Sequence, residues 1–123
     1  MTTQAITVWT EVPVTDMDRA VGFYNAVFGY DMQIDSTGPN PMALFGNTME
    51  GTGGHIYPGT PAKGGNGPTI HLALPGSLED GIAACAKAGG TVISPAIEIP
   101  PGRFAYAIDP DGNSIGLFEP KAA

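Results

Sequence analysis

The sequence has little cysteine, little positive charge and no long apolar run. Its one cysteine, Cys85, cannot form a disulfide within the chain, which suits a reducing compartment such as the cytoplasm. Only five residues are Lys or Arg and the formal net charge is −7, which argues against nucleic acid because phosphate contacts need clustered cations. No apolar run approaches the ~18 residues that span a bilayer, and the first residues lack the pattern of a signal peptide. We therefore expect a cytoplasmic protein that binds neither nucleic acid nor membrane.

Phosphate-cradling motifs are also missing. The glycine-rich segment 59–65 lacks the Gly-Lys-Ser/Thr ending of a P-loop, and no Gly-x-Gly-x-x-Gly follows a predicted strand. Glycine and proline are abundant instead, at 18 and 12 residues, and apolar runs recur along the whole length. This combination predicts a folded chain with many tight turns.

Two segments have the pattern of amphipathic helices with marked ends. In residues 17–28 apolar side chains recur at helical spacing, with Asp16 as the expected N-cap and Gly29 as the left-handed C-cap. The pattern returns about 60 residues later, with Ser77 as the expected N-cap and Gly89 as the expected C-cap of a second helix.

Short runs of alternating apolar residues predict strands around both helices. Pro95 is expected to break the sixth of them, and seven glycines and prolines between residues 58 and 68 mark the main linker. The expected strands are residues 6–14, 30–34, 42–45, 53–57, 69–74, 91–97, 104–108 and 114–118.

The order strand, helix, three strands occurs twice, which indicates two copies of one unit. Three strands follow each helix, so the sheets are expected to be mixed and curved and not wholly parallel. The predicted fold class is α+β, with two tandem βαβββ modules forming curved mixed sheets around a concave cavity. We expect one domain over residues 1–123, with modules at 5–57 and 68–119 and a linker at 58–67.

Two motifs resemble the vicinal oxygen chelate superfamily, which includes glyoxalase I, bleomycin-resistance proteins and extradiol dioxygenases. VTDMDRAVGFY at residues 14–24, followed by Phe-Gly-Tyr at 28–30, is similar to its first module. DPDGN at 109–113, followed by Ile-Gly-Leu at 115–117, is similar to the turn before its last strand. The resemblance covers essentially the whole chain and implies a homodimer. It says little about function, because this fold serves lyases, transferases, dioxygenases and drug-binding proteins.

Metal-dependent members of that superfamily place one ligand, often His or Glu, on each of four strands. The equivalent positions here are Trp9, Gly54 or its neighbour His55, Thr69 with His71 two residues on, and Gly116. Trp, Gly and Thr side chains supply no imidazole or carboxylate lone pair, so the resemblance implies no metal ligand and no cofactor here. A divalent metal stays open only as an atypical site of Glu11, His55 and His71.

Glu11 and His71 are the candidate catalytic residues. Each lies two residues past the first ligand position of its module, on the same strand face, so both are expected to point into the cavity. A carboxylate near an imidazole is a plausible acid/base couple. The structural alternative is that Glu11 pairs with Arg19 or Arg103, while His71 only packs within its strand.

Further side chains are candidates for binding an organic ligand, because ligand pockets combine apolar walls with a few polar groups. An indole at position 9 offers a stacking face to a planar ligand, and an arginine after Pro-Pro-Gly could reach a carboxylate. Core packing explains the aromatic residues equally well, and packing explains Cys85 better than catalysis does. The candidate ligand-binding residues are Trp9, Phe45, His55, Arg103 and Tyr106.

Three functions follow from these residues. The first is a metal-free protein that binds a small organic molecule in the cavity, as bleomycin-resistance proteins do. The second is a lyase or dioxygenase with an atypical metal site. The third is a metal-free lyase or isomerase that uses Glu11 and His71.

Overall fold

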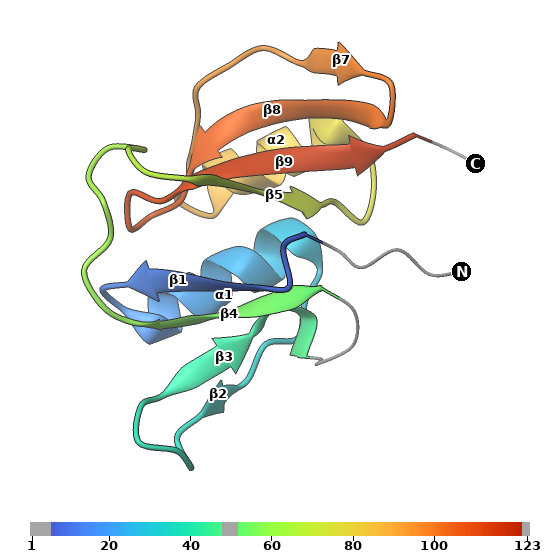
Figure 1. Ribbon diagram of the computed structural model, residues 1–123. Coiled ribbons are helices and arrows are strands. Elements are labelled where there is room, and N and C mark those ends of the chain that lie inside the picture. Colours follow the sequence, from blue (N-terminus) through green and yellow to red (C-terminus); the bar gives the residue numbers. More distant parts are fainter. Residues whose placement is uncertain (1–5, 48–51, 122–123) are drawn as a thin grey trace, which may run out of the picture.

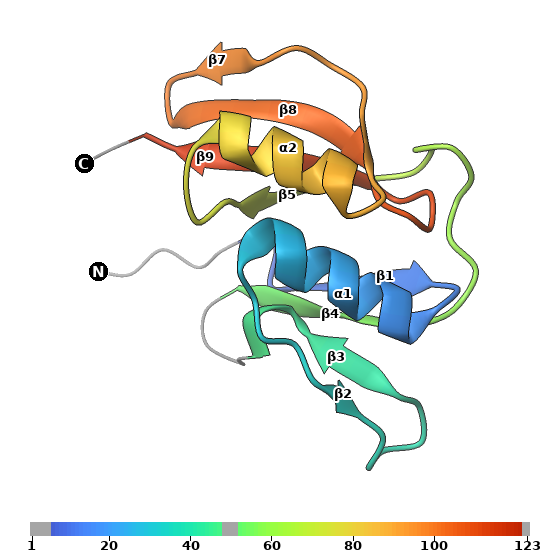
Figure 2. The same cartoon turned by 180° about the vertical axis from the view of Figure 1, so that it is seen from behind.

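The computed structural model describes residues 6–47 and 52–121, which form two mixed sheets with two helices on one side (Figures 1 and 2). The first sheet has the strand order β1-β4-β3-β2, in which β1 and β4 are parallel. Its elements are β1 (Trp9–Val14), α1 (Met17–Phe28), β2 (Ile34–Asp35), β3 (Met42–Leu44), the short 3-10 helix η1 (Phe45–Asn47) and β4 (Gly53–Pro58).

The second sheet repeats this arrangement with the order β5-β9-β8-β6, and β5 and β9 are again parallel. The strand β7 pairs with the same strand β8 as β6 does, so β6 and β7 form one edge interrupted around Pro95. The elements are β5 (Thr69–Ala73), α2 (Leu78–Lys87), β6 (Thr91–Val92), β7 (Ile97–Ile99), β8 (Gly102–Ile108) and β9 (Ser114–Pro120). The expected α+β class with two βαβββ units is confirmed.

Both helices begin where their caps predict. The side chain of Asp16 accepts a hydrogen bond from the backbone N–H of Arg19, and Gly29 ends α1 with a φ of 71°. Ser77 caps α2 in the same way through Asp80. Such caps satisfy backbone donors that have no partner inside the helix. No helix in these residues is both long and apolar enough to cross a membrane.

Two predicted strands begin later than expected, and the contacts of their first residues explain why. The first was expected to begin at residue 6, but β1 begins at Trp9, which pairs with Gly53 at the start of β4. Residues 30–34 were expected to form a strand, but only Ile34–Asp35 do so. Met32 is buried and donates its N–H to the side chain of Asn25 at 2.8 Å, outside any sheet. The expected module start at residue 5 lies outside the described residues.

One apolar core fills the space between the sheets and the helices. Alternate residues of the central strands face it, among them Val12 and Val14 of β1 and Ile115 and Leu117 of β9, all at most 5% exposed. Phe23 and Tyr24 of α1 and Leu78 of α2 meet these strands from the other side. Successive side chains of a strand point to opposite faces of its sheet, so the odd-numbered residues of β1 lie on the face away from the helices.

The turn at residues 109–113 joins the second module to the first. Asp109 is 3% exposed and accepts a hydrogen bond of 2.7 Å from the hydroxyl of Tyr24 in α1. Asp111 accepts from the backbone N–H of Thr15 and pairs with Arg19 at 2.7 Å. Asn113 donates to the carbonyl oxygen of Pro13 in β1 at 2.8 Å. Burial and the charge of Asp109 raise the pKa of Tyr24 well above its ordinary value, so the phenol stays a neutral donor.

We expect Tyr24→Phe to lower the free energy of unfolding by about 1–3 kcal/mol, because it removes one donor from a buried carboxylate. Urea denaturation measures this change. The matched control is Tyr57→Phe, since the hydroxyl of Tyr57 bonds to no residue in the described part of the chain. Equal stability of the two variants would contradict the role of the Tyr24–Asp109 hydrogen bond.

Candidate functional site

A cavity of about 980 Å³ lies where the inner edges of the two sheets, β1 and β5, face each other. Both strands line it, together with the linker and the start of β9. Its walls are largely apolar, with Tyr30, Phe45, Ile70 and Leu72 among them. The polar lining side chains in the described residues are Thr7, Thr10, Glu11, Thr52, Asn66, Thr69, His71, Asn113 and Ser114.

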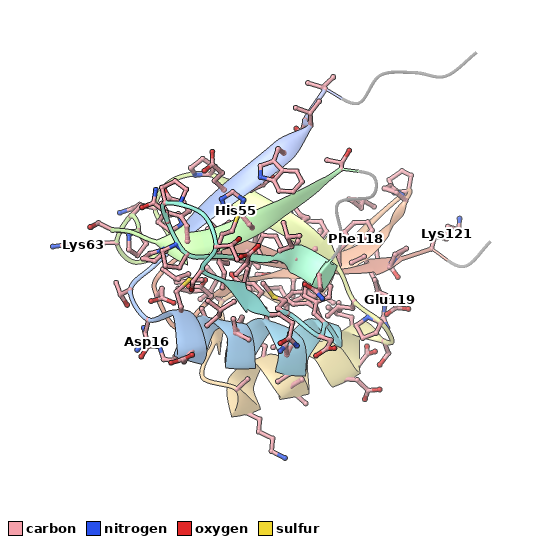
Figure 3. All side chains as sticks on the ribbon, turned by 90° about the horizontal axis from the view of Figure 1, so that it is seen from below. Asp16, His55, Lys63, Phe118, Glu119 and Lys121 are labelled. Carbon is pink, nitrogen blue, oxygen red and sulfur yellow. The ribbon has the colours of Figure 1, made fainter. Side chains whose placement is uncertain are left out.

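Glu11 and His55 lie side by side on the sheet face turned away from the helices. They are register partners in the parallel pair of β1 and β4, and His55 Nε2 is 3.3 Å from Glu11 Oε1. Figure 3 shows His55 on the far side of the sheet from both helices. Of the two residues considered for the second metal-ligand position, His55 lies on the face that holds Glu11, whereas Gly54 is buried against the backbone of Thr10.

Trp9 completes a row of three side chains with these two. Its indole Nε1–H donates a 3.0 Å hydrogen bond to Nδ1 of His55. Only a neutral imidazole has a lone pair on Nδ1, so this bond requires the tautomer with its proton on Nε2. In this tautomer the protonated Nε2 lies 3.3 Å from Oε1 of Glu11. The row Trp9–His55–Glu11 thus combines one hydrogen bond with one close contact between nitrogen and oxygen.

His71 lies on the second sheet within an aromatic cluster. Its ring centroid is 4.9 Å from that of Phe104 and 5.8 Å from that of Tyr106. His71 pairs in register with Gly116, and a side-chain carbon at position 116 would overlap the imidazole. The glycine therefore provides the space that the ring occupies.

These residues do not fit the metal of the superfamily. Within residues 6–47 and 52–121 no three His, Cys, Asp or Glu side chains gather as a ligand set. The lone pair of His55 accepts from Trp9, so metal binding through Nε2 would place two N–H groups against each other. At position 116, where metal-dependent relatives have a carboxylate, the imidazole of His71 fills the space.

The expected catalytic residues lie on opposite walls of one cavity. Glu11 lines it from β1 and His71 from β5, but the nearest imidazole to Glu11 is that of His55. The arginines suggested as partners for Glu11 pair elsewhere, Arg19 with Asp111 and Arg103 with Glu79 and Glu119. The catalytic role of Glu11 and His71 stays a prediction.

The expected ligand-binding residues are distributed over several places. Phe45 lines the cavity and is 7% exposed, whereas Tyr106 contacts His71 in the aromatic cluster. Arg103 lies by a separate hollow and binds two carboxylates, which raise the pKa of its guanidinium. Cys85 is fully buried, and burial with the charge of Asp109 raises the pKa of its thiol to about 11. Such a thiol packs and does not act as a nucleophile.

Sequence reasoning missed the hydrogen bond between Trp9 and His55 and the cavity position of Tyr30 and Asn113. The bond depends on the register of β1 against β4, which no local pattern specifies. Asn113 was visible as part of the DPDGN turn, but its contact with Pro13 depends on how the modules meet.

Comparisons with known proteins agree with this fold. The model of the family described as bleomycin resistance protein-like N-terminal matches residues 7–43. A glyoxalase/bleomycin resistance protein of Albidiferax ferrireducens has a similar structure, with a TM-score of 0.73, 23% identity, and coverage of 95% of this chain and 100% of that one. TnmS3, an antibiotic binding protein from a Streptomyces species, has a TM-score of 0.63 at 24% identity, with coverage of 98% and 100%.

The candidate glyoxylase CFP32 of Mycobacterium tuberculosis, like that of Mycobacterium bovis, is 33% identical over 120 residues. The match covers 92% of this chain, which spans only 43% of the length of these curated relatives. Together, the family model, the curated relatives and the solved structures support a relationship to the vicinal oxygen chelate superfamily of glyoxalases and bleomycin-resistance proteins.

We expect His55→Phe to change the fluorescence emission of Trp9, the one tryptophan in the chain, because it removes the lone pair that accepts the indole N–H. His55→Gln should preserve more of the native emission, since an amide oxygen can accept the same bond. His71→Gln is the control and should leave the emission unchanged. Native emission in His55→Phe would contradict the assignment of this hydrogen bond.

We expect the protein to retain far less than one equivalent of metal per chain. The measurement is native mass spectrometry on protein purified without chelator or affinity tag, after incubation with Ni, Zn, Fe and Mn. The reason is that the four superfamily positions lack a matching set of lone pairs. Retention of about one metal per chain would contradict this fit and would make His55 and His71 the first ligands to replace.

Proposed function

We propose that the protein binds a small, partly aromatic organic molecule in the cavity between β1 and β5, without a metal. The observation that carries this proposal is the lining of the cavity, which combines apolar walls with a few polar side chains. Its volume of about 980 Å³ is at the upper end of ordinary ligand pockets. The similar structure of an antibiotic binding protein supports a binding role.

A cavity-filling variant tests this proposal. Ala73 is exposed on β5 and lines the cavity, so Ala73→Phe places a ring in the space that a ligand would occupy. Overlap of the added ring with a ligand should weaken binding by about 1–3 kcal/mol, which is roughly 5- to 150-fold. The measurement is ligand-observed NMR with a library of small planar molecules. The control Ala83→Phe adds the same ring on an exposed position of α2 and should bind as the native chain does. Equal loss in both variants would argue against this cavity.

A second candidate is a metal-free lyase or isomerase. It is favoured because Glu11 and His71 line one cavity from opposite walls, and Glu11 contacts His55. In that case Glu11 would take a proton from a carbon acid. Deuterium incorporation from D₂O into small α-carbonyl compounds, followed by NMR, tests this reaction. Glu11→Gln should fold normally and abolish the exchange, and unchanged exchange would exclude Glu11 as the base.

We further propose that the protein is a cytoplasmic homodimer. The support is the superfamily resemblance for the dimer, and for the compartment the single cysteine, which lies buried and unpaired in the core. The mass of the native protein in solution tests the assembly, and a monomeric mass would contradict it.

A further inference from the structure

The charges around the cavity are unbalanced. Among the lining residues that the structure describes, Glu11 is the one carboxylate, and none is Lys or Arg. Its side chain is 65% exposed, so a bound molecule can reach it from the cavity mouth. A cavity with one fixed negative charge and apolar walls attracts cations and disfavours anions.

The carboxylate of Glu11 lies beside an imidazole that is itself held in place. Oε1 of Glu11 lies 3.3 Å from His55 Nε2, and the imidazole is held from its other nitrogen by Trp9. His55 is itself only 14% exposed, so it forms a fixed support and not a mobile surface group. The described residues place no donor on Oε2, which leaves that oxygen for a ligand.

Aromatic rings flank His55 beside Glu11, outside the residues that line the cavity, and the rings in the described lining itself are Tyr30, Phe45 and His71. The ring centroid of His55 is 5.8 Å from that of Trp9 and 6.0 Å from that of Tyr57. The faces of Trp and Tyr rings attract cations, and they also stack on planar groups. A molecule that carries a cation and a planar ring could therefore contact both the carboxylate of Glu11 and the lining rings of Tyr30 and Phe45.

We propose that the cavity selects a positively charged ligand with a planar ring, and that Glu11 binds its cationic group. The ligand class is an aromatic amine or amidine. This inference rests on the proposed binding function and narrows it, because the lining offers a partner for a cation and no arginine or lysine for an anion.

Three probes of nearly the same shape test the charge preference. They are benzamidinium, benzamide and benzoate, which are positive, neutral and negative, and their dissociation constants are measured by ligand-observed NMR at low salt. Benzamidinium should bind about fivefold more tightly than benzamide, as expected for an exposed ion pair, and benzoate should bind most weakly. High salt should reduce the difference.

Two variants assign the preference to one residue. Glu11→Gln should bind benzamidinium and benzamide equally, whereas the control Glu98→Gln removes the same charge from the exposed strand β7 and should keep the preference. Equal binding of the three probes to the native chain would overturn the charge inference and leave the binding function standing. A preference that survives in Glu11→Gln would overturn the role of Glu11. Failure of all three probes to bind would overturn the inference together with the proposed function.

Discussion

The docking of the two modules depends on the buried carboxylate of Asp109. A carboxylate that is 3% exposed is costly unless its oxygens are satisfied. Its donors come from both modules, because Tyr24 reaches it from α1 and the N–H groups of Asp111 and Asn113 reach it from its own turn. The turn alone supplies two of these donors, and docking adds the hydroxyl of Tyr24, so this group favours the docked arrangement.

The position of the cavity follows from that docking. Asn113 donates to the carbonyl of Pro13 at the end of β1, and the next residue, Ser114, begins β9 and pairs with Thr69 of β5. The turn thus holds β1 and β5 as neighbouring sheet edges, as Figure 1 shows. Since each strand pairs with its own sheet on the other side, a space remains between them. Glu11 and His71 line this space from opposite sides because they occupy equivalent places in the two modules.

The helices could be predicted from the sequence because their signals are local. Asp16, Ser77 and Gly29 act at the positions where their chemistry is favoured, whatever the rest of the chain does. Strand ends depend on partners instead, and so β1 begins where Gly53 begins to pair with it. The face of His55 could not be predicted for the same reason, since a shift of one residue reverses it.

Trp9 and Gly116, which stand where metal-dependent relatives have ligands, each contact one of the two histidines. Trp9 stands at an expected ligand position and donates to Nδ1 of His55, whose other nitrogen lies 3.3 Å from Glu11. Gly116 replaces another ligand and opens the space in which His71 packs against Phe104. Each change thus removes a lone pair and gives the neighbouring imidazole a new partner. The two imidazoles are thus positioned by the residues at the other expected ligand positions, Trp9 through a hydrogen bond and Gly116 through the space that it leaves.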